Sequence, residues 1–255
     1  MLVLEISALF YLLIMLIISI GWYTTSVFVA KEGDTKKSIS VVVAIRNEAD
    51  KIGKLLDSIK RQSYPKDKFE LIIVDDKSDD DSISRVNNFI EENPQLEIKL
   101  INSKGEGKKA AIKTAVNYSA NDIVVCTDGD CMVSKDWLGN YASFFENDDV
   151  KLVFAAVFYK QSNRLIEKLF SLEFMSLVAS GAGSSGMGLT LMGNGANIGF
   201  SKQAYLEVVS KMKGDKYASG DDVFLMHSIA STYGKKAVKF LKSNDCVVDS
   251  PAPKS

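Results

Sequence analysis

The sequence predicts an α/β protein in which one N-terminal transmembrane helix precedes a mostly parallel sheet flanked by helices. Three observations support this. The N-terminal segment is apolar and uncharged, short apolar runs alternate with segments of helical periodicity, and acidic residues collect directly after the apolar runs. Strands that are buried on both faces read as continuous apolar runs, and their alternation with helices is typical of a parallel sheet.

The N-terminal segment carries no charge from Ile6 to Ala30. About 20 apolar residues cross a bilayer, whereas the apolar region of a secretory signal has about 7 to 15 residues and ends at a cleavage site. Lys31, Lys36 and Lys37 follow the segment, so the positive-inside rule places the remainder in the cytoplasm. We therefore expect a single-pass anchor at 1–30, a polar linker at 31–37 and a cytoplasmic domain at 38–255. A buried hydrophobic helix is the alternative interpretation.

The domain begins with a regular alternation of two patterns. Apolar runs predict strands, and intervening segments with apolar residues on one helical face predict helices. The expected strands are 39–45, 69–74, 96–101 and 123–127, and the expected helices are 52–59, 83–90 and 108–118. This order indicates a Rossmann-like parallel sheet, in which ligands bind at the carboxyl ends of the strands.

Polar residues follow each of these strands. The four clusters are Arg46-Asn47-Glu48, Asp75-Asp76-Lys77-Ser78, the lysine and glycine residues of 103–108, and Asp128-Gly129-Asp130. Two carboxylates this close repel each other unless a hard cation such as Mg²⁺ or Mn²⁺ lies between them and a bound phosphate. An ordinary polar turn is the structural alternative for Asp128-Gly129-Asp130.

The second half of the domain has a different pattern. A strand-like segment at 150–158 leads into a predicted amphipathic helix at 165–179, whose larger apolar residues we expect in the core: Phe170, Phe174, Met175 and Leu177. A glycine-rich stretch, for which we expect a flexible backbone, follows from Gly181 to Gly199. Within it, 193–197 (Gly-Asn-Gly-Ala-Asn) allows the close backbone approach that a pocket wall requires, with a plain loop as the alternative. Asp221 and Asp222 then begin a helix, as caps or as catalytic groups.

Composition argues against several other classes. With 31 Lys and Arg against 32 Asp and Glu, the net charge of −1 does not favour nucleic acid as a partner. Three cysteines without ligand spacing predict neither a disulfide nor zinc. The Gly105 and Gly107 pair that follows the third strand is not a Gly-X-Gly-X-X-Gly fingerprint, and no Gly-Lys-Ser/Thr motif is present, which weighs against nicotinamide binding and P-loop chemistry.

The ordered motifs carry a family resemblance. With 75–76 (Asp-Asp), 128–130 (Asp-Gly-Asp), 193–197 and 220–222 (Gly-Asp-Asp) in this order, residues 38 to 250 resemble the inverting glycosyltransferases of family 2, which have the GT-A fold. The resemblance implies a nucleotide-sugar donor, most often a UDP-sugar, and a divalent Mg²⁺ or Mn²⁺ ion that bridges its diphosphate. A membrane-proximal glycan or lipid-linked acceptor would place the enzyme in polysaccharide or glycolipid biosynthesis.

The resemblance also assigns roles position by position. It implies a nucleoside pocket at Arg46 and Glu48, a contact with the base at Asp76, a phosphate or ribose contact at Lys108, a ribose or metal-water contact at Asp128 and a metal ligand at Asp130. Asp222 matches the general base that takes a proton from the acceptor. The acceptor side or pocket wall would comprise Gly193, Asn194, Gly195, Asn197 and Asp221.

Two departures and two alternatives complete the expectations. Ile112 and Lys113 replace the family's usual Leu and Asn, and no Gln-X-X-Arg-Trp element follows the acidic motif. The enzyme therefore either works without that element or is a shortened form of a longer protein. A nucleotidyltransferase would carry a glycine-rich basic loop after the first strand, which Arg46-Asn47-Glu48 lacks. A non-catalytic, membrane-tethered nucleotide-sugar-binding protein is the other alternative.

Overall fold

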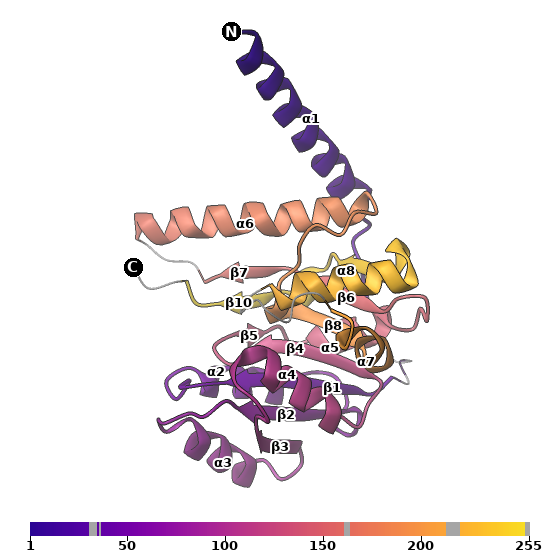
Figure 1. Ribbon diagram of the computed structural model, residues 1–255. Helices are drawn as coiled ribbons and strands as arrows, with labels where there is room; N and C mark the ends of the chain where they lie inside the picture. Colours follow the sequence, from indigo (N-terminus) through magenta and orange to yellow (C-terminus); the bar gives the residue numbers. More distant parts are fainter. Residues whose placement is uncertain (31–34, 36, 161–163, 213–219, 253–255) are drawn as a thin grey trace.

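A central sheet with helices on both faces makes up the body of the protein (Figure 1). The computed structural model describes residues 1–255 except 31–34, 36, 161–163, 213–219 and 253–255. Most of the predicted linker at 31–37 therefore lies outside the described residues.

The main sheet has the strand order β3-β2-β1-β4-β8-β6-β9. Its first four strands are mutually parallel and match the predicted ones: β1 (Ile39–Ile45), β2 (Phe69–Asp75), β3 (Glu97–Asn102) and β4 (Ile123–Asp128). β8 (Ile198–Ser201) runs antiparallel to both β4 and β6 (Leu152–Ala155), and β9 (Val238–Leu241) runs parallel to β6. The prediction of a mostly parallel sheet is confirmed.

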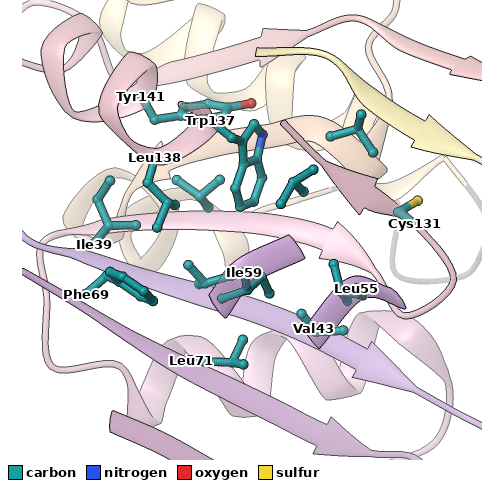
Figure 2. Close-up of a cluster of buried hydrophobic side chains, with 14 of the residues drawn as sticks. Ile39, Val43, Leu55, Ile59, Phe69, Leu71, Cys131, Trp137, Leu138 and Tyr141 are labelled. Carbon is teal, nitrogen blue, oxygen red and sulfur yellow. The ribbon is translucent and has the colours of Figure 1, made fainter. Parts of the chain in front are cut away.

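Helices cover the two faces of the sheet and create two apolar clusters. One cluster includes α2 (Ile52–Lys60), α3 (Ser82–Glu92) and α5 (Trp137–Phe144), and Figure 2 shows Trp137 and Tyr141 packed beside the aliphatic side chains of β1 and α2. The other includes α4 (Gly107–Tyr118), α7 (Lys202–Val209) and α8 (Asp221–Tyr233). Burial on both faces explains why β1 and β2 are apolar at most positions, and the buried Ser40 of β1 donates to Glu70 of β2.

A small second sheet lies between the main sheet and α6. It has the order β5-β10-β7, formed by Met132–Val133, Val248–Ser250 and Val157–Tyr159. The prediction of one strand-like segment at 150–158 is therefore wrong. The segment is divided at Ala156 into β6 and β7, because the carbonyl of Ala156 accepts hydrogen bonds from Asn197 and Val248 instead of continuing the ladder. Short 3-10 turns occur at Lys66–Lys68 (η1), Gly195–Asn197 (η2), Lys235–Ala237 (η4) and Asn244–Cys246 (η5).

Two long helices lie outside this body. α1 (Leu2–Thr24) is long and apolar enough to cross a membrane, as judged by length and composition. α6 (Leu165–Gly186) extends beyond the predicted end at 179 and includes three glycines of the stretch expected to be flexible. It runs across the base of α1 (Figure 1). The expectation that Met175 and Leu177 lie in the core is wrong, because both are more than two-fifths exposed.

Candidate active site

The carboxyl ends of β1, β2 and β4 form one edge, where the predicted acidic residues gather. Strand register places Asp75 opposite Ile45 and Asp128 opposite Ala44. The loops after β1 and β2 are joined by hydrogen bonds: the backbone N–H of Asn47 donates to Ser78 Oγ at 3.0 Å, and the backbone N–H of Glu48 donates to Ser82 Oγ at 2.7 Å. The two polar clusters therefore form a single connected rim.

Asp76 lies at the base of this rim with a side chain that is only 6% exposed. Its Oδ2 accepts a hydrogen bond from the backbone N–H of Gly107 at 2.8 Å, and Arg46 lies 4.0 Å from the same oxygen. Its Oδ1 is buried and has no hydrogen-bond partner among the described residues. A buried acceptor without a donor is costly, so this oxygen is suited to receive an N–H group from a ligand. Asp75 instead accepts from the backbone N–H of Ser78 and supports the turn.

A lysine that sequence reasoning missed joins the first and fourth strand ends. Lys51 Nζ lies 3.1 Å from Glu48 Oε2 and 3.4 Å from Asp130 Oδ2. The pKa of the Glu48 carboxyl is raised above its ordinary value, chiefly by burial. Lys51 lowers this pKa, whereas the nearby Asp130 and Asp128 raise it further. Glu48 and Asp130, predicted on separate loops, therefore belong to one charged group. Nothing in the sequence pattern distinguished Lys51 from an ordinary surface lysine on a helix.

Lys108, at the start of α4, lies between the two acidic motifs. Its ammonium group forms an ion pair with Asp128 Oδ1. Partial burial lowers the pKa of Lys108, but Asp128 and, more weakly, Asp222 raise it, and the net direction is upward. The left-handed Gly107, with φ of 84°, precedes it and turns the chain into the helix. The structure therefore brings the ammonium group of Lys108 close to both Asp128 and Asp222.

Asp222 is the second residue of α8, which begins at Asp221 after the left-handed Gly220. Its Oδ2 accepts a hydrogen bond from the backbone N–H of Gly195 at 2.8 Å, and its Oδ1 accepts one from Val223 at 2.8 Å. Each carboxylate oxygen has further acceptor capacity, so Asp222 supports the helix start and still has room for another donor. Asp221 Oδ1 lies 3.1 Å from Lys109 Nζ. Lys108 and Lys109 thus reach two different acidic motifs.

A cavity of about 270 Å³ adjoins Asp222. Its polar side is formed by Lys108, Gly195 and Asp221 together with Asp222. Its floor is apolar and includes Cys126 of β4, and burial raises the pKa of that thiol to about 12. The thiol is therefore a packing group, and the chemistry of this cavity belongs to its carboxylates and lysines.

The predicted acceptor-side residues do not all reach this cavity. Gly195 does, but Gly193 and Asn194 line a separate cavity of about 110 Å³ that also touches α6. Asn197 is fully buried in the core. Its Oδ1 accepts from Trp137 Nε1 and Tyr141 Oη, both at 2.9 Å, and its Nδ2 donates to two backbone carbonyls. The structure thus places Asn197 as a support beneath η2, in contrast to the expected pocket wall.

The residues at the edge fit a divalent ion that arrives together with a diphosphate. Within the described ranges, no group of three or more His, Cys, Asp or Glu side chains is placed to hold a metal by itself. Mg²⁺ and related hard cations commonly use one or two carboxylates and take their remaining oxygen ligands from substrate phosphates and water. Asp128 and Asp130 supply two such carboxylates, and the pairing of each with a lysine shows that this position accommodates positive charge.

Comparison with known proteins identifies relatives of this chain. The family model described as glycosyl transferase family 2 matches residues 40–207. Glycosyltransferase AglE of Haloferax volcanii is 35% identical over 115 residues, which cover 45% of this chain and 38% of that protein. A beta-monoglucosyldiacylglycerol synthase of Synechocystis sp. is 31% identical over 108 residues, which cover 42% of this chain and 22% of that protein. The aligned part thus spans well under half of these relatives.

Solved structures show a similar fold. The mannosyltransferase PcManGT from Pyrobaculum calidifontis, in complex with GDP-Man and Mn²⁺, has a TM-score of 0.76 and 24% identity, with 98% of this chain and 68% of that chain covered. S. aureus TarS 1-349 in complex with UDP-GlcNAc has a TM-score of 0.59 and 19% identity, with 86% and 59% covered. These likenesses confirm the predicted GT-A architecture.

Proposed function

This chain belongs to glycosyl transferase family 2, and we propose that it moves a sugar from a nucleotide-sugar donor to an acceptor held at a membrane, with inversion at the anomeric carbon. The family match favours this over the nucleotidyltransferase alternative. The observation that carries the proposal is the position of Lys108, which forms an ion pair with Asp128 and lies near Asp222. Lys108 and Asp222 both line the cavity of about 270 Å³, and Lys108 connects this cavity to the donor-side Asp128.

The donor would bind along the edge formed by β1, β2 and β4. The unpartnered Oδ1 of Asp76 would accept an N–H group of the base, with Arg46 and Glu48 lining the nucleoside pocket. Lys108 would contact a phosphate, because a cation paired with a single exposed carboxylate can exchange partners when an anion arrives. Asp128 and Asp130 would hold a divalent ion, which would stabilise the negative charge that develops on the leaving diphosphate.

Asp222 would act as the general base. Its position at the cavity and its remaining acceptor capacity allow an acceptor hydroxyl to donate to it. As that proton moves to Asp222, the acceptor oxygen forms a bond to the anomeric carbon. The bond from that carbon to the diphosphate oxygen breaks on the opposite side, and the nucleoside diphosphate leaves. A single displacement of this kind inverts the configuration.

The acceptor would be presented at a membrane surface. α1 supplies the anchor by its length and apolar composition, and the lysines that follow it favour a cytoplasmic active site. The name of the Synechocystis relative specifies a glucosyldiacylglycerol product, and the TarS relatives are named for a polyol-phosphate polymer acceptor. A lipid-linked acceptor therefore agrees with the anchor and with the name of the Synechocystis relative.

A titration of the detergent-solubilised chain tests the donor site. UDP, GDP, ADP and CDP are each added with Mn²⁺ and with EDTA, and heat release is recorded. We expect one nucleoside diphosphate to bind in the presence of Mn²⁺ and to lose affinity in EDTA. Release of free sugar or transfer to a lipid extract from the matching nucleotide-sugar then distinguishes an enzyme from a binding protein. Absence of binding by all four nucleotides with metal would contradict the proposal.

A further inference from the structure

The outward side of α6 is an apolar surface that the rest of the described chain leaves uncovered. We name it the α6 face and define it by five apolar residues that are each at least 44% exposed: Leu165, Ile166, Leu169, Leu172 and Met175. Leu165, Leu169 and Leu172 follow the i, i+4, i+7 spacing and are 75%, 52% and 61% exposed, so they form one stripe. An apolar stripe of this size marks an interaction surface.

The opposite side of α6 fixes the orientation of this face. Phe174 stacks on Tyr159 of β7 with ring centroids 4.2 Å apart, and it also lines the cavity next to Gly193. Phe174 and Val178 lie four residues apart, on the side of the helix turned away from Leu169. The helix is therefore apolar on two sides, one against the protein and one turned outward. The inward side has partners in the protein, whereas the leucines of the outward side are exposed.

Close backbone packing joins α6 to α1. A Cβ atom at Gly183 would lie 2.3 Å from the carbonyl oxygen of Ile18, and one at Gly186 would lie 2.0 Å from that of Gly21. Only glycine permits this approach, so the two helices meet at a fixed crossing. Lys242 strengthens the base of α1, since its Nζ donates to the carbonyl of Trp22 at 2.7 Å and lies 4.2 Å from the Trp22 ring.

We infer that the α6 face lies on the surface of the same lipid bilayer that α1 spans, as a second membrane contact. The inference rests on the proposed insertion of α1. Its 23 residues measure about 35 Å, enough for a hydrocarbon core of about 30 Å. If α1 spans the core, its C-terminal end marks the interface, and the C-terminal end of α6 packs against α1 there (Figure 1). α6 therefore lies at the level of the interface, on the side of the protein from which α1 extends.

The charged residues of α6 agree with an interfacial position. Lys168 and Glu173 lie on opposite sides of Leu169 around the helix, and both are exposed. Long charged side chains beside an apolar stripe can reach the headgroup layer while the helix axis stays in the interface. A second copy of the chain is the competing occupant. It would cover the α6 face alone, whereas a bilayer covers α1 and α6 together.

The segment after α6 links this face to the active site. Met187, Leu189 and Leu191 continue the exposed apolar surface, and Gly195, which donates to Asp222, follows a few residues later. His227 of α8 lies 2.6 Å from the carbonyl oxygen of Thr190 and ties this segment to the helix that carries Asp222. The membrane contact would therefore hold the cavity at a fixed height and tilt relative to the lipid surface.

Spin labels on the full chain in nanodiscs test the inference. Single cysteines replace Leu9 in α1, Leu169 and Leu172 on the α6 face, and Leu206 on α7. The native Cys126, Cys131 and Cys246 are buried and do not compete for the label. Leu206 is the matched control, because it is an exposed leucine on a helix that covers the sheet. Accessibility to oxygen, which concentrates in lipid, is compared with accessibility to a water-soluble nickel complex.

We expect labels at Leu9, Leu169 and Leu172 to favour oxygen, and the label at Leu206 to favour nickel. Nickel accessibility at Leu169 and Leu172 with lipid exposure at Leu9 would overturn the α6 inference alone. Nickel accessibility at Leu9 would overturn the anchor as well. Spin-spin broadening at Leu169 would show that a second copy covers the face, and would also overturn it.

A substitution at the helix crossing provides a second test. Gly183→Leu should separate α6 from α1, because its side chain meets the backbone of Ile18. In the labelled chain, we expect the oxygen accessibility at Leu169 to fall while that at Leu9 is unchanged. Gly53→Leu is the control, since a Cβ atom at Gly53 meets nothing within 4 Å. An unchanged label at Leu169 in Gly183→Leu would contradict the account of a fixed crossing.

Discussion

Replacement of Asn197 by alanine tests whether this residue supports the core or contacts a substrate. Its side chain makes four hydrogen bonds, all within the protein. Truncation leaves Trp137 Nε1 and Tyr141 Oη as buried donors without their acceptor. Each such group costs about 1 to 3 kcal/mol, so we expect a loss of about 2 to 6 kcal/mol in the free energy of unfolding. At about 2 to 4 °C per kcal/mol, the melting temperature should fall by roughly 4 to 24 °C.

A thiol-reactive fluorophore gives the readout for this experiment. The three cysteines are buried, so fluorescence rises only when the domain unfolds. Asn194→Ala is the matched control, because it removes a single local hydrogen bond to the backbone N–H of Ala196. That loss should cost about 0.5 to 2 kcal/mol. If Asn197→Ala had the same melting temperature as the unmodified chain, the four hydrogen bonds would not contribute the stability assigned to them. The structural role of Asn197 would then be refuted.

Three further predictions concern the site. Lys108→Met should weaken binding of the nucleoside diphosphate about 10- to 100-fold, because a charge-assisted hydrogen bond contributes about 1.5 to 3 kcal/mol. Unchanged affinity in the titration would exclude Lys108 from the phosphate site. Asp130→Ala should remove the difference in donor affinity between Mn²⁺ and EDTA. Asp148→Ala removes a remote exposed carboxylate and should preserve that difference. A metal effect that survives in Asp130→Ala would place the ion elsewhere. Burial raises the pKa of Cys126 to about 12, so at pH 8 about one thiol in 10⁴ is ionised. Iodoacetamide should therefore label Cys126 only after denaturant is added. Rapid labelling of the native chain would contradict the buried position of Cys126.

The first half of the fold could be predicted because its strands are buried on both faces. β1, β2 and β4 are apolar at most positions, and their register then aligns the acidic residues at one edge. Local periodicity and the rule that ligands bind at carboxyl ends were sufficient there. The same reasoning assigned Asp76, Asp128 and Asp130 to this edge, and they follow or end strands that lie in register in the sheet.

The second half depends on contacts that local sequence does not encode. Glycines at 181–186 predicted a flexible stretch, yet they are helical because α1 packs against them. The hydrogen bonds of Asn197 to Trp137 and Tyr141 span more than 50 residues, so nothing in the Gly-Asn-Gly-Ala-Asn pattern distinguishes core support from a pocket wall. Lys51 was missed for the same reason, since its pairing with Asp130 exists only in the folded sheet.

The most direct test of the central claim compares transfer and donor binding in Asp222→Asn. The general base acts mainly in the transition state, so we expect transfer to fall by about 10² to 10⁴ while the affinity for the nucleotide-sugar stays within about twofold. Retained affinity also shows that the variant is folded, although one of the two backbone N–H groups loses its carboxylate partner. Transfer at the unmodified rate, or equal loss of binding and transfer, would contradict the assignment of Asp222 as the base.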